Sequence, residues 1–148
     1  MDIIPKERRS WNMSRIRARN TKPERIVRSV LHRQGARFRL HRKDLPGCPD
    51  IILPRYLLVI FVHGCFWHRH NGCKYTYTPK SRVEFWKDKF ERNVRRDTQA
   101  REELKNLGWS VGIVWECETR DTESLAIRIA ALLSEHHRLG VDLGKLVR

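Results

Sequence analysis

The sequence has few acidic residues relative to its basic residues, and it has no long hydrophobic run. Its 148 residues include 17 Asp and Glu against 31 Lys and Arg, which gives a formal charge of +14. The longest apolar run, residues 56–62, is far too short to cross a bilayer. No apolar stretch follows the charged N-terminus, so we expect no secretory signal. These absences exclude a membrane span, a fibre and a secreted disulfide scaffold, and they favour one soluble cytoplasmic domain.

The basic residues are concentrated towards the N-terminus. Residues 1–44 contain 14 Lys and Arg against 4 acidic residues, whereas residues 107–148 contain 5 against 6. A basic surface attracts a phosphate backbone, because neutralising phosphates releases their counterions. The charge distribution therefore indicates a nucleic acid as partner. A solvated arm that contacts nothing remains the alternative.

Hydrophobic spacing predicts a mixed α/β domain. Thr21 can cap a helix, Pro23 suits its first turn and Gly35 can end it. Apolar spacing predicts two further helices and four strands. The order helix, three strands, helix, strand, helix predicts a mixed central sheet with helices on its faces. The expected helices are residues 21–35, 82–106 and 121–137, and the expected strands are residues 37–41, 50–53, 56–62 and 109–115.

The segment after the third predicted strand is rich in cysteine and histidine. Without an export signal, cysteines at such spacing indicate metal binding rather than disulfides. Cys65, His70 and Cys73 lie within nine residues, so one loop can surround a zinc ion. Cys117, just after a predicted strand, is the expected fourth ligand, and Cys48 is the alternative. Four protein ligands leave no open position, so we expect structural zinc. Ordinary buried thiols and surface histidines are the other interpretation.

Asp50 is a candidate ligand for a second kind of metal ion. It is the only acidic residue between Asp44 and Glu84, and it begins a predicted strand after a Pro-Gly-Cys-Pro turn. Mg²⁺ prefers hard oxygen ligands of this type. An Asp after Pro and Gly also commonly caps a turn, so both interpretations stay open on the residues alone.

Several motifs occur in order along the chain, at residues 12–14 (NMS), 20–24 (NTKPE), 46–50 (PGCPD), 61–68 (FVHGCFWH), 84–86 (EFW), 93–97 (NVRRD) and 114–117 (VWEC). Together they resemble the very-short-patch-repair (Vsr) DNA mismatch endonucleases. The similarity spans about residues 10–135. It implies a restriction-endonuclease-like fold of the PD-(D/E)XK type, with a structural zinc. It also implies Mg²⁺-dependent nicking of one DNA strand, 5′ to the T of a T·G mismatch left by deaminated 5-methylcytosine.

The resemblance implies how Mg²⁺ is held. The family's metal-binding carboxylate corresponds to Asp50. The next metal contact corresponds to Val62, which stands where the family usually has Thr and would use its main-chain carbonyl. Glu24 corresponds to an acid near the active site, in contact with a second metal or with water. Its alternative role is that of a first-turn helix acid.

The resemblance also implies catalytic roles for two histidines and an aspartate. His68 would be the general base, because its ordinary pKa lies near working pH. Asp97 would hold the His68 ring, and His63 would lie near the scissile phosphate. The sequence alone leaves open whether His68, instead of His70, is the zinc ligand.

Aromatic residues and the N-terminal arm are the expected DNA contacts. Phe66, Trp67 and Trp86 correspond to side chains that wedge into DNA beside the mismatch, and Met13 would enter from the other groove. Separating stacked bases costs less free energy at a mispaired step, and flat side chains replace the stacking that the bases lose. For Trp109 and Trp115, both on a predicted strand, we expect burial in the core.

We therefore expect three parts: a basic DNA-clamping arm over residues 1–20, an endonuclease domain over 21–138 and a flexible tail over 139–148. A monomer is expected, since cutting one strand needs one active site. The expected setting is the bacterial cytoplasm, on the nucleoid when bound to DNA, with mismatched duplex DNA and other mismatch-repair proteins as partners. The alternatives are a related nuclease with different or no mismatch specificity, and a non-catalytic zinc-stabilised DNA-binding module.

Overall fold

The computed structural model describes the backbone of residues 20–147 and the side chains of residues 20–136. Met13 and the expected arm, apart from Asn20, lie outside the described residues. The elements are α2 (Lys22–Arg33), β1 (Arg39–Leu40), β2 (Ile51–Leu53), η1 (Pro54–Tyr56), β3 (Leu58–His63), α3 (Val83–Asn106), β4 (Ser110–Trp115), η2 (Glu116–Arg120) and α4 (Thr122–Val147). Their order is the one that the sequence predicts.

The four strands form one mixed sheet in the order β1-β2-β3-β4. The pairs β1/β2 and β2/β3 are antiparallel, whereas β3/β4 is parallel and spans six residue pairs. β3 is an inner strand and is almost wholly buried, as expected for a near-continuous apolar run. The prediction of a mixed sheet is confirmed.

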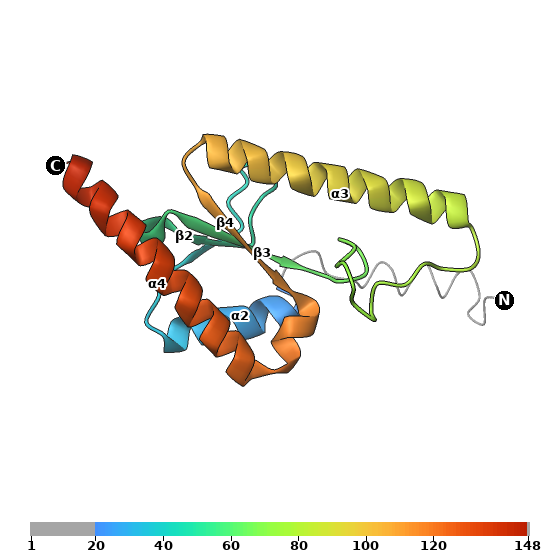
Figure 1. The fold of residues 1–148 in the computed structure, drawn as a ribbon, viewed down its shortest axis with the longest axis horizontal. Helices are drawn as coiled ribbons and strands as arrows, with labels where there is room; N and C mark the ends of the chain where they lie inside the picture. The colour runs from blue at the N-terminus through green and yellow to red at the C-terminus, as the bar shows by residue number, and fades with distance from the viewer. Residues whose placement is uncertain (1–19, 148) are drawn as a thin grey trace.

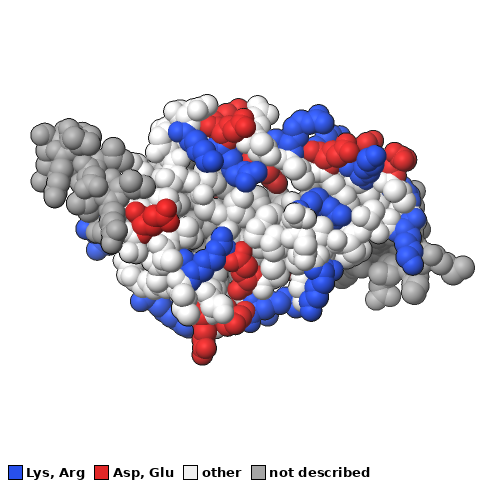
Figure 2. All heavy atoms as spheres, in the orientation of Figure 1, with Lys and Arg blue, Asp and Glu red and all other residues white. Residues whose placement is uncertain are grey.

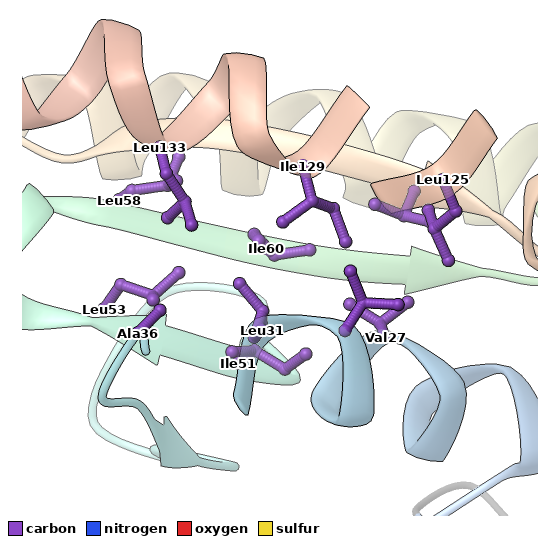
Figure 3. Close-up of a cluster of buried hydrophobic side chains, with 12 residues drawn as sticks. Val27, Leu31, Ala36, Ile51, Leu53, Leu58, Ile60, Leu125, Ile129 and Leu133 are labelled. Carbon is purple, nitrogen blue, oxygen red and sulfur yellow. The ribbon is translucent and has the colours of Figure 1, made fainter. Parts of the chain in front are cut away.

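Helices cover both faces of this sheet (Figure 1). α3 lies on one face, and α2 and α4 lie together on the other. Side chains alternate between the two faces along each strand. Leu58 and Ile60 join the cluster under α2 and α4, whereas Val59 and Phe61 join the cluster under α3. Figure 3 shows the first cluster, in which side chains from α2 and α4 meet those of the strands.

Local signals in the sequence set the bounds of α2. The Thr21 side chain caps the helix by accepting from the backbone N–H of Glu24, and Pro23 lies in the first turn. Gly35 follows the helix with a φ of +75°, a conformation that costs glycine little. Val27 and Leu31, one turn apart, point from this helix into the core (Figure 3). These features are as predicted.

Three boundaries differ from the prediction. β1 has only two residues, and it ends before His41, whose φ of +51° ends the extended backbone. Tyr56 belongs to η1 rather than to a strand, and Leu57, at φ +49°, turns the chain into β3. The last helix does not end near His137 but continues to Val147, since residues 138–147 contain no proline that would stop it.

No helix in the described part of the chain is long and apolar enough to span a membrane. The face shown in Figure 2 carries acidic and basic side chains interspersed, including over α3. This face of the described structure is therefore not uniformly basic.

Candidate active site and metal centre

The topology brings the chemically active residues to one edge of the sheet. Because β3 and β4 are parallel, they end together, at His63 and Trp115. β2 is antiparallel to β3, so its start, just after Asp50, lies at the same edge. The loop that contains Cys65 follows β3, and Cys117 follows β4. Residues distant in sequence therefore converge at this edge.

A cleft of about 820 Å³ opens at this edge. It is bounded by the start of α2, the end of β3, the loop that follows β3, and the middle of α3. The predicted site residues that line it are Glu24, Asp50, Val62, His63, Trp67, His68 and Asp97. The structure thus brings all five predicted catalytic residues to one cleft.

On one side of the cleft lies a carboxylate group formed by Glu24, Asp50 and His41. One ligand atom from each lies within 4.8 Å of the others. Asp50 Oδ2 accepts a 2.7 Å hydrogen bond from the backbone N–H of Val62. Burial, together with the neighbouring Glu24, raises the pKa of Asp50 to about 7, against the lowering effect of that hydrogen bond. Two carboxylates so close together, Glu24 buried and Asp50 half-buried, favour either a proton or a cation between them.

Glu24 reaches this position through the periodicity of α2. It lies one turn before Val27 and two turns before Leu31, so it shares their buried face, and it is only 2% exposed. At the sheet edge this face passes from the apolar core to the cleft. The helix thus presents a carboxylate where its buried stripe ends.

On the other side of the cleft, His63, His68 and Asp97 form a second group. His68 Nδ1 lies 2.7 Å from Asp97 Oδ2, and the His63 and His68 rings stack with centroids 3.8 Å apart. His63 is 5% exposed, and burial lowers its pKa to about 3, helped by the nearby His68. His63 is therefore neutral near pH 7, and the Asp97 carboxylate orients the His68 ring.

Cys65, His70, Cys73 and Cys117 form a third group, whose ligand atoms all lie within 4.8 Å of one another. Cys117 Sγ lies 3.4 Å from His70 Nδ1, and the Cys117 backbone N–H donates to Cys65 Sγ at 3.4 Å. Inside the loop, the Thr76 hydroxyl donates to the carbonyls of Cys65 and His70. Three sulfurs and one imidazole match the preference of zinc for N and S ligands.

This grouping bears on two alternatives that the sequence leaves open. The cluster contains His70 and not His68, which pairs with Asp97 instead. It contains Cys117 and not Cys48, which lines the cleft. Both assignments follow from contacts between segments far apart in the chain.

A half-buried aromatic cluster adjoins the cleft, between the loop after β3 and the first turns of α3. The Phe66 ring lies 5.0 Å from Trp67 and 5.8 Å from Trp86, and the two indoles lie 5.9 Å apart. The Lys89 ammonium sits 5.1 Å from the Trp67 ring, a distance typical of a cation–π contact. Phe90, 6% exposed, forms the base of the cluster. The structure thus brings together the three aromatic residues expected to contact DNA.

Comparisons with known proteins assign the chain to a family. A family model described as "DNA mismatch endonuclease Vsr" matches residues 1–74. The "Type II nicking enzyme V.XorIIP" of Xanthomonas oryzae pv. oryzae is 50% identical over 132 residues, which are 89% of this chain and 96% of that protein. The chain belongs to the Vsr family. "DNA mismatch endonuclease Vsr" of Escherichia coli K12 is 45% identical over 124 residues, which are 84% of this chain and 79% of that protein.

The resemblance seen in the sequence is therefore confirmed, and the protein is a DNA-nicking endonuclease of the Vsr family. A solved structure, the "Homing Endonuclease I-Bth0305I Catalytic Domain", has a TM-score of 0.55 and covers 79% of this chain and 98% of that domain. At 20% sequence identity, this likeness concerns the fold alone.

Trp115 in this Vsr-family chain does not lie in the core as expected. It is half-buried, and its ring stacks on His70 with centroids 4.3 Å apart. Its ring also meets the His63 ring edge-on, with centroids 5.3 Å apart. Trp115 therefore lies between the cysteine and histidine cluster that contains His70 and the group that contains His63 and His68. Trp109 is half-buried and packs against the core cluster under α3, close to the expectation.

Sequence reasoning missed two residues of the cleft region, His41 and Arg28. His41 follows a two-residue strand, and no local pattern marks it as part of a site. Arg28 could have been found, because it lies one helical turn after Glu24 and its guanidinium donates to that carboxylate at 2.9 Å.

Proposed function

We propose that this Vsr-family endonuclease is a Mg²⁺-dependent DNA mismatch endonuclease that nicks one strand 5′ to the T of a T·G mismatch. One observation carries the proposal: the carboxylate group of Glu24, Asp50 and His41 and an aspartate-oriented histidine face each other across one cleft, beside an aromatic cluster. The fold is of the restriction-endonuclease type. The name of the Escherichia coli relative supports the mismatch substrate.

Asp50 and Glu24 are the residues that would hold Mg²⁺, with the main-chain carbonyl of Val62 as a further oxygen. Their fit to the ion rests on two carboxylates, one buried and one half-buried, whose oxygens are close enough to share one cation. When bound, Mg²⁺ supplies charge stabilisation at the phosphate and the leaving oxygen. The Val62 backbone N–H keeps Asp50 in place, so its carboxylate needs no rearrangement to act.

His68 acts as the general base that removes a proton from the attacking water. The hydrogen bond to Asp97 uses Nδ1, which leaves Nε2 to accept that proton. As His68 becomes positively charged, the Asp97 carboxylate stabilises the imidazolium. His63 stays neutral beneath the His68 ring and holds it in orientation near the scissile phosphate.

The Cys65, His70, Cys73 and Cys117 cluster holds a structural Zn²⁺. The loop that it orders has no helix or strand between β3 and α3 and carries both His68 and Trp67. Zinc binding therefore contributes to folding and places the general base. The zinc has a supporting role and takes no part in the hydrolysis.

Phe66, Trp67 and Trp86 contact the mismatched step, and the basic residues 1–20 clamp the duplex with Met13 in the opposite groove. Stacking on these rings offsets the cost of unstacking the mispaired bases. Selectivity for T·G arises partly because a mispaired step deforms more readily. The protein acts as a monomer in the bacterial cytoplasm, alongside other mismatch-repair proteins, with residues 139–148 outside the catalytic unit.

A matched duplex assay tests this proposal. Purified protein is incubated with a T·G duplex and with the same duplex carrying T·A, with and without Mg²⁺. We expect a single nick 5′ to the mismatched T, only with Mg²⁺ and only in the T·G duplex. Equal cutting of both duplexes would support a nuclease without mismatch specificity. Binding without cutting would support a non-catalytic zinc-stabilised module.

A further inference from the structure

Arg28 contacts Glu24, a member of the carboxylate group, without lining the cleft itself. It lies on α2, one turn after Glu24, and its side chain is 16% exposed. Among the described residues that line the cleft, Glu24 and His41 are present and Arg28 is not. The neighbouring Val27 and Leu31 anchor α2 in the core (Figure 3), so the helix that carries Arg28 is fixed against the sheet.

Two donors converge on one oxygen of Glu24, and His41 lies beside it. Arg28 Nη2 donates to Oε2 at 2.9 Å, and the backbone N–H of Asn20 donates to the same atom at 3.0 Å. His41 Nε2 lies 3.5 Å from it. Because the two donors, Arg28 Nη2 and the Asn20 N–H, both engage Oε2, they set the plane of the carboxylate and therefore the position of its second oxygen, Oε1.

His41 contacts both Arg28 and the backbone of Asp50. Its Nε2 lies 3.1 Å from Arg28 Nη2, and since a guanidinium can only donate, Nε2 is the acceptor. Its backbone N–H donates to the Asp50 carbonyl at 3.3 Å. A φ of +51° is uncommon for a non-glycine residue, and such conformations are retained where the surrounding structure requires them.

Arg28 is not placed for hydrogen bonding alone. Its Nε is buried and has no hydrogen-bond partner among the described residues. Leaving a buried donor unpaired costs stability, so the position of the guanidinium has another cause. That cause is electrostatic: the guanidinium charge lies 2.9 Å from the Glu24 carboxylate, which is otherwise repelled by the Asp50 carboxylate, with ligand oxygens of the two within 4.8 Å of each other.

We propose that Arg28, assisted by His41, is a positioning residue that holds Glu24 in the orientation in which it shares a divalent cation with Asp50. This inference rests on the proposed function, in which Glu24 and Asp50 hold the metal. Arg28 itself touches neither the cation nor the DNA. Without it, the Glu24 carboxylate loses its strongest anchor and its neighbouring positive charge.

The experiment measures Mn²⁺ binding to the zinc-loaded full chain by electron paramagnetic resonance, without DNA. We expect Arg28→Gln to weaken Mn²⁺ binding by roughly 10-fold to 100-fold, the usual effect of losing a group that orients a metal ligand. Arg28→Lys should restore most of the affinity. The matched control is Arg25→Gln, which removes the same charge from an exposed position on the same helix and should leave Mn²⁺ affinity unchanged.

A double-mutant cycle separates positioning from a general structural effect. In a Glu24→Gln background, Arg28→Gln should cause no further loss of Mn²⁺ affinity, because its target is already gone. In nicking assays, Arg28→Gln should lower kcat and leave the KM for DNA unchanged. His41→Gln should weaken Mn²⁺ binding in the same direction but by less.

Several results would overturn the inference. These are no Mn²⁺ binding by the parent protein, an unchanged affinity in Arg28→Gln, or an equal loss in the Glu24→Gln background. If Arg28→Gln lost its zinc or failed to fold, the Mn²⁺ titrations of Arg28→Lys and His41→Gln would test the inference in its place. An unchanged Mn²⁺ affinity in His41→Gln would then contradict the inference. Failure of the parent to nick T·G DNA would instead contradict the proposed function, since the Mn²⁺ titration contains no DNA.

Discussion

His68 and Asp97 are paired through a 2.7 Å contact between Nδ1 and Oδ2, although they lie 29 residues apart, one in a loop and one in the middle of α3. The pairing leaves Nε2 of His68 as the nitrogen available to the cleft. A carboxylate placed in this way selects one tautomer and stabilises the charged ring. The general-base role proposed for His68 depends on this contact.

Asp97→Asn should therefore lower kcat for nicking by about 10²-fold to 10⁴-fold, because the amide no longer holds the correct tautomer or stabilises the imidazolium. Single-turnover nicking of the T·G duplex measures the effect. Asp88→Asn, an exposed change on the same helix, is the matched control and should nick at the parental rate. Equal rates for the two variants would remove Asp97 from the mechanism.

Asp50→Ala should abolish nicking while the protein keeps its zinc and its affinity for DNA. The half-buried Asp50 carboxylate is the expected anchor of Mg²⁺, and alanine offers no ligand in its place. Nicking assays over a range of Mg²⁺ concentrations, with DNA binding measured in parallel, make the test. A variant that still nicks at the normal rate would show that the cation is held elsewhere.

Cys65→Ala should release zinc and unfold the protein, because Cys65 is 1% exposed and lies in the Cys and His cluster. Zinc content by mass spectrometry and thermal melting measure the change. Cys48→Ser, outside the cluster, should retain zinc in full. If Cys65→Ala melted like the parent, the structural-zinc proposal would fail.

The stability of the protein should fall as pH decreases below about 6.5, in part because of His63. Burial lowers the pKa of His63 to about 3 in the folded state, so between these pH values the unfolded chain binds a proton that the folded chain does not. By pH 5 this difference removes about 2 kcal/mol of the free energy of unfolding. Urea unfolding at pH 7 and pH 5 measures it. Between pH 7 and pH 5, His63→Gln should lose about 2 kcal/mol less of the free energy of unfolding than the parent protein. An identical loss in the two proteins would contradict the lowered pKa of His63.

Trp67→Ala should weaken binding to the T·G duplex by about 1 to 3 kcal/mol, the usual contribution of one stacking aromatic. Trp67→Phe keeps a flat ring and should lose less. Fluorescence anisotropy with T·G and T·A duplexes compares the two affinities. If Trp67→Ala lost the same affinity for both duplexes, the ring would contribute to DNA binding and not to mismatch selection.

Much of the fold was predictable because its signals are local. The Thr21 cap, the apolar stripe of α2 and the buried run of β3 each depend on residues within a few positions of one another. The error in β1 arises where a non-local constraint decides. β1 ends at the positive φ of His41, whose N–H donates to the carbonyl of Asp50, just before the neighbouring strand β2.

The sequence by itself determined the element order, the mixed sheet, the family and the residue types of the candidate site. It did so because helical and strand periodicity, capping and motif spacing are properties of short segments. Only the tertiary structure decided which histidine joins the cysteines, that Cys117 lies against Cys65 across 52 residues, and that Arg28 and His41 surround Glu24. Those relationships exist only when the parallel pair β3 and β4 ends at the same edge where β2 and α2 begin.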